Sequence, residues 1–76
     1  MMTDEYWIVR FINNRGRVGN QIRYGWEPSR EEVIRSVRRY RAIGVSVVAV
    51  KISKFRDTID KDLTLSQEIS CDELSI

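Results

Sequence analysis

The sequence predicts a small α+β domain with the order strand, strand, helix, strand: a ββαβ domain in which one amphipathic helix packs on a sheet of three strands, or of four. Two apolar segments flank a turn-forming cluster, which indicates a hairpin. A capped segment with helical periodicity and a run of β-branched residues follow. The 76 residues are 42% apolar, enough for one hydrophobic core.

The first strand is expected over residues 5–12, where residues 6–12 form two alternating sets of side chains that are apolar apart from Arg10. Residues 13–16, Asn-Asn-Arg-Gly, tolerate positive φ and predict the hairpin turn. Apolar side chains then recur at even positions from Val18 to Trp26, and polar residues or glycine separate them. This alternation predicts a half-buried second strand over residues 18–26.

The helix is expected to begin at Ser29, which together with Glu32 forms the pattern of a capping box. The apolar residues of the following segment fall within one arc of a helical wheel, and charged residues lie opposite. Gly44 predicts the helix end, because glycine readily adopts the left-handed conformation. Arg41 falls inside the apolar arc, so we expect its side chain to extend past the sheet or to meet a carboxylate.

Residues 45–52 are rich in β-branched side chains and predict the third strand. We expect the connection through the helix to place this strand beside the first, parallel to one neighbour. Residues 53–76 lose the pattern, and all six acidic residues of this stretch lie within residues 56–76. We therefore assign residues 1–55 to the ββαβ domain and residues 56–76 to an acidic tail, which forms a short extra strand or a weak helix, or stays disordered.

Several classes of protein are disfavoured by composition. The chain has one cysteine, Cys71, and no histidine, so an internal disulfide and the usual zinc sites are excluded. No histidine base or Walker-type phosphate loop is present, and we expect no enzyme activity, no cofactor and no metal. No apolar stretch approaches the length of a membrane span, and the acidic N-terminus is atypical of a secretory signal. We expect a cytoplasmic protein.

Charge is distributed unevenly along the chain. Residues 1–52 carry ten basic and five acidic residues, whereas residues 53–76 carry three basic and six acidic ones. Arginine outnumbers lysine ten to three, and its planar guanidinium group suits carboxylate and phosphate recognition. We therefore expect an anionic partner, with an acidic protein surface as the first expectation and nucleic acid as the alternative.

Two groups of basic residues and one apolar set are the candidate partner-binding residues. The groups are Arg35, Arg38 and Arg39 on the outer helix face and Arg15 and Arg17 in the hairpin; the apolar set is Tyr6, Ile8 and Ile12. The two basic groups could converge on one anionic ligand, or the helix face could be solvated, with Glu31 pairing with Arg35. One helix covers one sheet face, so this apolar set or the alternate one is expected to meet a partner, a second copy or the tail.

These observations predict a small non-enzymatic binding protein that modulates or inhibits a larger macromolecular assembly through protein contacts. In size and composition the chain resembles the small accessory and inhibitor proteins of phages and mobile elements. The alternative is a DNA- or RNA-binding protein that uses the arginine-rich helix face and the hairpin loop. A homodimer formed through an open strand edge or the apolar sheet face is a third prediction.

Overall fold

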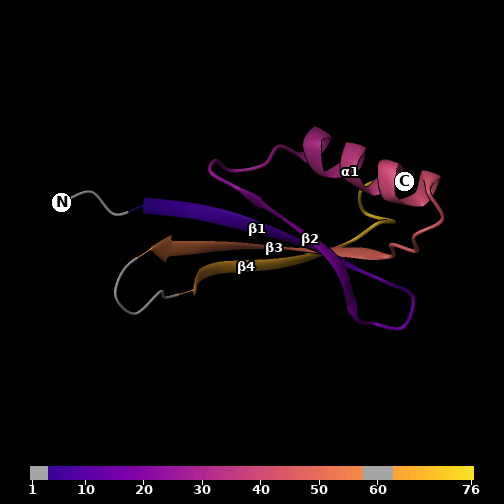
Figure 1. Cartoon of the computed structure of the whole chain (residues 1–76), viewed down its shortest axis with the longest axis horizontal. Helices are drawn as coiled ribbons and strands as arrows, with labels where there is room; N and C mark the ends of the chain where they lie inside the picture. The colour runs from indigo at the N-terminus through magenta and orange to yellow at the C-terminus, as the bar shows by residue number, and fades with distance from the viewer. Residues whose placement is uncertain (1–3, 58–62) are drawn as a thin grey trace.

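The computed structural model describes residues 4–57 and 63–76 and has the predicted α+β architecture (Figure 1). The elements follow in the order β1 (Asp4–Ile12), β2 (Val18–Tyr24), α1 (Arg30–Ala42), β3 (Ala49–Asp57) and β4 (Leu63–Ser70). The fourth strand that the sequence left open is therefore present, and the sheet is the four-stranded version of the predicted fold.

The strands lie in the order β2-β1-β3-β4, and each neighbouring pair is antiparallel. The third strand does lie beside the first, but the expectation of a parallel neighbour was wrong. The reason is that β1 occupies the place between β2 and β3. Those two strands run in the same direction on either side of β1, and the hairpin makes β1 antiparallel to both.

Two strand boundaries differ from those predicted. The third strand begins at Ala49 rather than at residue 45 and continues to Asp57. Residues before Ala49 instead form the connection from α1, where the Val45 amide donates to the Tyr40 carbonyl. The second strand ends at Tyr24. Trp26 lies beyond it, and its indole N–H donates to the Glu32 carboxylate at 3.2 Å.

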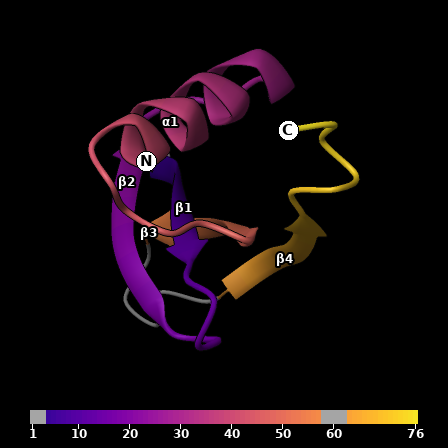
Figure 2. The same ribbon diagram turned by 90° about the vertical axis from the view of Figure 1, so that its right-hand side faces the viewer.

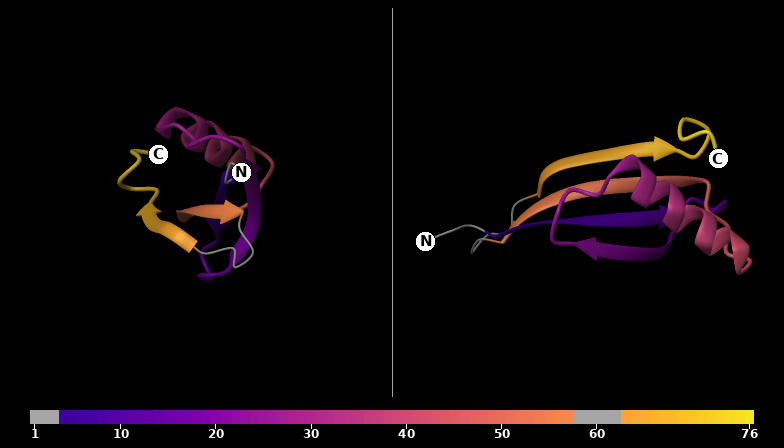
Figure 3. Two further views of the ribbon diagram at one scale, coloured as in Figure 1. Left: turned by 90° about the vertical axis from the view of Figure 1, so that its left-hand side faces the viewer. Right: turned by 90° about the horizontal axis from the view of Figure 1, so that it is seen from above.

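One face of the sheet is covered by α1, and the core lies between these two layers (Figures 2 and 3). Six side chains in this core are at most 2% exposed: Val9, Phe11, Val33, Val37, Val47 and Val50. They come from β1, α1, β3 and the connection between α1 and β3. Because successive side chains of a strand point to opposite faces, the alternate residues of β1 and β3 point away from the helix.

The N-terminus of α1 has the predicted capping box. The Ser29 hydroxyl accepts from the Glu32 amide at 3.1 Å, and the Glu32 carboxylate accepts from the Ser29 amide at 3.2 Å. The other end is closed as predicted by Gly44, whose φ of 88° is left-handed and whose amide donates to the Arg41 carbonyl. Both ends of the helix are thus satisfied by local contacts.

The Ser29→Ala variant is expected to lose about 1 kcal/mol of unfolding free energy, because the first turn loses its hydroxyl acceptor. For a domain of this size such a loss lowers the midpoint of thermal unfolding by about 4–8 °C. Circular dichroism at 222 nm measures it. Ser36→Ala, a substitution within the helix, is the matched control, and equal midpoints for the two variants would show that the cap contributes nothing.

The C-terminal residues 71–76 return to the side of the sheet that α1 covers (Figure 2). Cys71 and Leu74 are buried in the core, and the Cys71 amide donates to the Val48 carbonyl at 2.9 Å. Burial raises the pKa of the Cys71 thiol, so this group stays protonated at neutral pH. The thiol lies 3.5 Å from the Val47 carbonyl, to which it donates.

Arg41 also donates to the Val47 carbonyl, from Nε at 3.2 Å and from a terminal nitrogen at 2.8 Å. The sequence led us to expect a carboxylate or an extended, solvated side chain. The guanidinium instead donates to a backbone carbonyl in the connection between α1 and β3, close to the end of the helix. Arg41 therefore helps to hold this connection in place.

Candidate binding surface

The face of the sheet opposite α1 is covered by none of the elements that the structure describes (Figure 3). We call it the open sheet face. Its residues follow from the strand register and the alternation of side chains: Tyr6, Ile8, Arg10, Ile12, Gln21, Arg23, Lys51, Phe55, Ser66 and Glu68. Ser53 points to the same face but is fully buried. This face combines apolar, aromatic and cationic side chains, which is a composition typical of binding surfaces.

An aromatic pair lies at one end of the open sheet face. Tyr6 and Phe55 are directly opposite on β1 and β3, and their rings stack with centroids 5.3 Å apart and planes 11° apart. The Arg23 guanidinium lies 3.9 Å from the centroid of Tyr6, and that of Arg10 lies 5.8 Å from the centroid of Phe55. We call these four side chains the aromatic–arginine stack. It places two cations beside two rings on an uncovered face.

Two like charges face each other in the middle of this surface. Arg10 and Lys51 are direct partners across β1 and β3, an arrangement that costs free energy when nothing compensates it. Glu68 is the β4 partner of Lys51, yet within the described residues neither cation has a carboxylate within 4 Å. Lys54, by contrast, forms an ion pair of 2.6 Å with Glu5. The open sheet face therefore carries two directly opposed cations, with one carboxylate, that of Glu68, opposite Lys51 on β4 and outside ion-pair distance.

The predicted apolar set lies on this surface. Tyr6, Ile8 and Ile12 are half-buried on the open sheet face, whereas the alternate set, which contains Val9 and Phe11, lies under α1. The C-terminal turn packs on the α1 side, so it does not cover Tyr6, Ile8 or Ile12. Sequence reasoning identified these three residues but missed their charged neighbours on the adjacent strands.

The predicted basic groups do not converge. Arg15 and Arg17 are exposed in the hairpin loop, where the Asn13 side chain accepts from both of their amides at 2.9 and 3.1 Å. The tip of this hairpin points away from α1 (Figures 1 and 2). The helix arginines are therefore on the other side of the sheet from the hairpin loop. They are Arg35, Arg38 and Arg39, all exposed.

The alternative interpretation of the helix face, an ion pair between Glu31 and Arg35, is not seen within 4 Å among the described residues. Arg35 and Arg39 are one turn apart with like charge, a mild cost on a solvated helix. The helix arginines thus form a second basic surface, separate from the open sheet face.

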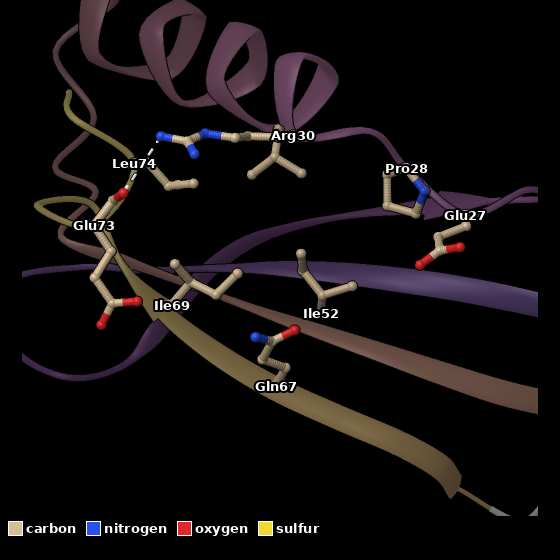
Figure 4. Close-up of a pocket in the computed structure, with 9 residues that line it drawn as sticks. Glu27, Pro28, Arg30, Ile52, Gln67, Ile69, Glu73 and Leu74 are labelled. Atoms are coloured by element: carbon tan, nitrogen blue, oxygen red, sulfur yellow. Dashed lines mark hydrogen bonds between the residues drawn. The ribbon is translucent and has the colours of Figure 1, made fainter.

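A hollow of about 360 Å³ opens beneath the N-terminus of α1 (Figure 4). Its apolar part is formed by Pro28, Val33, Ile52, Ile69 and Leu74. At its rim the Arg30 guanidinium donates to the Glu73 carbonyl at 3.4 Å. Two carboxylates, those of Glu27 and Glu73, and the Arg30 guanidinium line this hollow, so the lining has one negative charge in excess. No group of His, Cys, Asp or Glu side chains suited to a metal ion occurs in residues 4–57 and 63–76.

None of the helices within the described ranges is long and apolar enough to cross a membrane. Comparisons of the chain with protein-family models, with curated proteins and with solved structures found no match. Function is therefore inferred from the surfaces of this chain alone.

Proposed function

We propose that this chain is a small non-enzymatic binding protein that modulates a larger assembly by holding an acidic protein surface against its open sheet face. The observation that carries the proposal is the Arg10–Lys51 pair, two cations directly opposite on an uncovered face, with no carboxylate of the described residues within 4 Å of either. A carboxylate-bearing partner would relieve their repulsion. Binding would then be favoured because it relieves a repulsion between Arg10 and Lys51 that destabilises the free protein.

The apolar residues beside the cations favour a protein as the partner. Ile8 and Ile12 flank Arg10 on β1 and are half-buried, so their remaining exposed surface can be buried by a partner. Protein interfaces commonly combine arginine and aromatic anchors with apolar contacts. Arg15 and Arg17 would extend the same surface at its hairpin end.

Nucleic acid is the second candidate, because aromatic residues beside cations on a sheet are also used to bind single strands. The Tyr6–Phe55 pair is the observation that favours it. If Arg10, Arg23 and Lys51 each contact one phosphate of a single strand, log affinity should fall with log salt with a slope of about −2. Because salt also screens ion pairs with carboxylates, the two candidates are separated by nuclease treatment.

Capture from a lysate of the source organism, with and without nuclease, tests the proposal. We expect the wild-type chain to retain a discrete protein after nuclease treatment. Arg10→Glu/Lys51→Glu should reduce its recovery roughly tenfold or more, because a buried interfacial charge pair typically contributes more than 1.4 kcal/mol. Arg35→Glu/Arg39→Glu is the matched control, since it reverses two charges on the other side of the sheet.

Capture that depends on the helix arginines and not on Arg10 and Lys51 would place the partner on α1 and contradict the proposal. Material that disappears with nuclease would identify the chain as a nucleic-acid-binding protein. Light scattering of the purified chain at two concentrations tests for a homodimer. If the chain dimerises through the open sheet face or an edge strand, the average molar mass should rise with concentration.

A further inference from the structure

We propose that Tyr6 and Phe55 are positioning residues: their rings hold the guanidinium groups of Arg23 and Arg10 in place for the carboxylates of an acidic protein segment, and do not themselves stack on the partner. This inference rests on the proposed function of the open sheet face. It specifies the chemistry of the partner and assigns the aromatic pair a role through the arginines.

The strand order explains which side chains contact the Tyr6 ring in the free protein. Tyr6 lies on β1, between β2 and β3, so Arg23 approaches its ring from one side and Phe55 from the other. A guanidinium 3.9 Å from a ring centroid is well within the range of a cation–π contact. A nucleotide base would have to displace Arg23 before it could stack on Tyr6. The free protein is therefore arranged for carboxylates rather than for bases.

Arg10 is held less closely, at 5.8 Å from the Phe55 centroid, and it also faces Lys51. A guanidinium that lies on a ring keeps its N–H groups at its edge available, and these can bind a carboxylate through two parallel hydrogen bonds. Because such an arginine is already restrained, it loses less conformational entropy when a partner binds. The stack thus prepares two cations for one carboxylate-rich segment.

The first experiment observes the stack in the free protein. In an NMR spectrum, the side-chain protons of Arg23 should lie upfield of their usual positions because they sit over the Tyr6 ring. Tyr6→Leu should return them to ordinary positions, whereas Tyr6→Phe, which keeps a ring, should leave them shifted. Ordinary Arg23 shifts in the wild-type protein would overturn the inference, whatever the protein binds.

The second experiment measures binding of two labelled probes, a decaglutamate peptide and a ten-residue oligothymidylate, over a range of salt concentrations. We expect wild type to bind decaglutamate more tightly. Tyr6→Leu should weaken that binding about fivefold, because Arg23 loses its restraint. The salt dependence should not change, since no charge is removed, and Tyr6→Phe should restore the affinity.

Arg23→Lys provides a further test, because lysine keeps the charge and loses the planar group. It should weaken decaglutamate binding, and Arg38→Lys is the control, since Arg38 is exposed on α1, on the other side of the sheet from the aromatic–arginine stack. Melting curves of every variant check that folding is retained.

The outcomes separate the two proposals. If wild type binds decaglutamate and Tyr6→Leu binds it equally tightly, the positioning role is wrong and the proposed function stands. If wild type binds neither probe, the proposed function fails. The aromatic–arginine stack then has no role in binding a partner, even if the NMR shifts show that Arg23 lies over the Tyr6 ring. Tighter binding of the oligothymidylate, lost in Tyr6→Leu, would show that the rings stack on bases and overturn the inference.

Discussion

Phe11→Ala is expected to destabilise the protein by about 3–5 kcal/mol, the range for removing a buried aromatic ring from a core. Phe11 is 1% exposed, and its ring lies 4.9 Å from that of Tyr40 on α1 at an angle of 58°. The residue belongs to β1, which has a paired strand on each side. The substitution therefore leaves a cavity where the helix and the sheet meet.

The size of the domain makes this loss decisive. Native proteins are stable by roughly 0.05–0.15 kcal/mol per residue, which for this chain amounts to about 4–11 kcal/mol. Urea denaturation followed by circular dichroism should show a variant that is largely unfolded without urea or that unfolds at a low urea concentration. Phe55→Ala is the control, because that ring is half-buried on the open sheet face. A similar loss for both substitutions would argue against a core on the α1 side alone.

Local chemistry explains which parts of the fold were predictable. The capping box of Ser29 with Glu32 and the left-handed Gly44 depend on residues within a few positions, so the limits of α1 could be predicted. The boundaries of β3 could not, because they depend on long-range pairing. Val48 donates to the carbonyl of Ile12, and the sheet register with β1 begins only at Ala49.

For the same reason, the sequence predicts the fourth strand only as one alternative among several. Residues 63–70 alternate weakly in hydrophobicity, and their strand conformation is stabilised by pairing with β3. A strand whose partner lies elsewhere in the chain gives little local signal when its own side chains are mostly polar.

The candidate surface was predictable only in part. The alternation of β1 identified Tyr6, Ile8 and Ile12 as one set, but Arg10 was interpreted only as an interruption of it. Its importance comes from its opposition to Lys51, which requires the register between β1 and β3. One local signal was available: Lys51, Ser53 and Phe55 alternate with Val50 and Ile52, so a strand extended beyond residue 52 would have placed Lys51 and Phe55 on one face.

Leu74→Ala is expected to lower the unfolding free energy by about 2–5 kcal/mol, because a buried leucine loses its contacts and leaves a cavity. Leu74 is 6% exposed and lies with Val33 of α1 and Ile69 of β4 in the core. Asp72→Ala is the matched control in the same turn, where the side chain is exposed and the expected change is within about 0.5 kcal/mol.

The reactivity of the Cys71 thiol gives a second measurement for Leu74→Ala. Cys71 is buried and burial raises the pKa of its thiol, so the wild-type protein should react slowly with a disulfide reagent at pH 8. Loosening of the turn by Leu74→Ala should expose the thiol, lower its pKa towards the ordinary value and speed the reaction. If Leu74→Ala instead changes neither the stability nor the reaction rate, the C-terminal turn contributes nothing to the core, and the stability of the domain must come from the packing of α1 on the sheet alone.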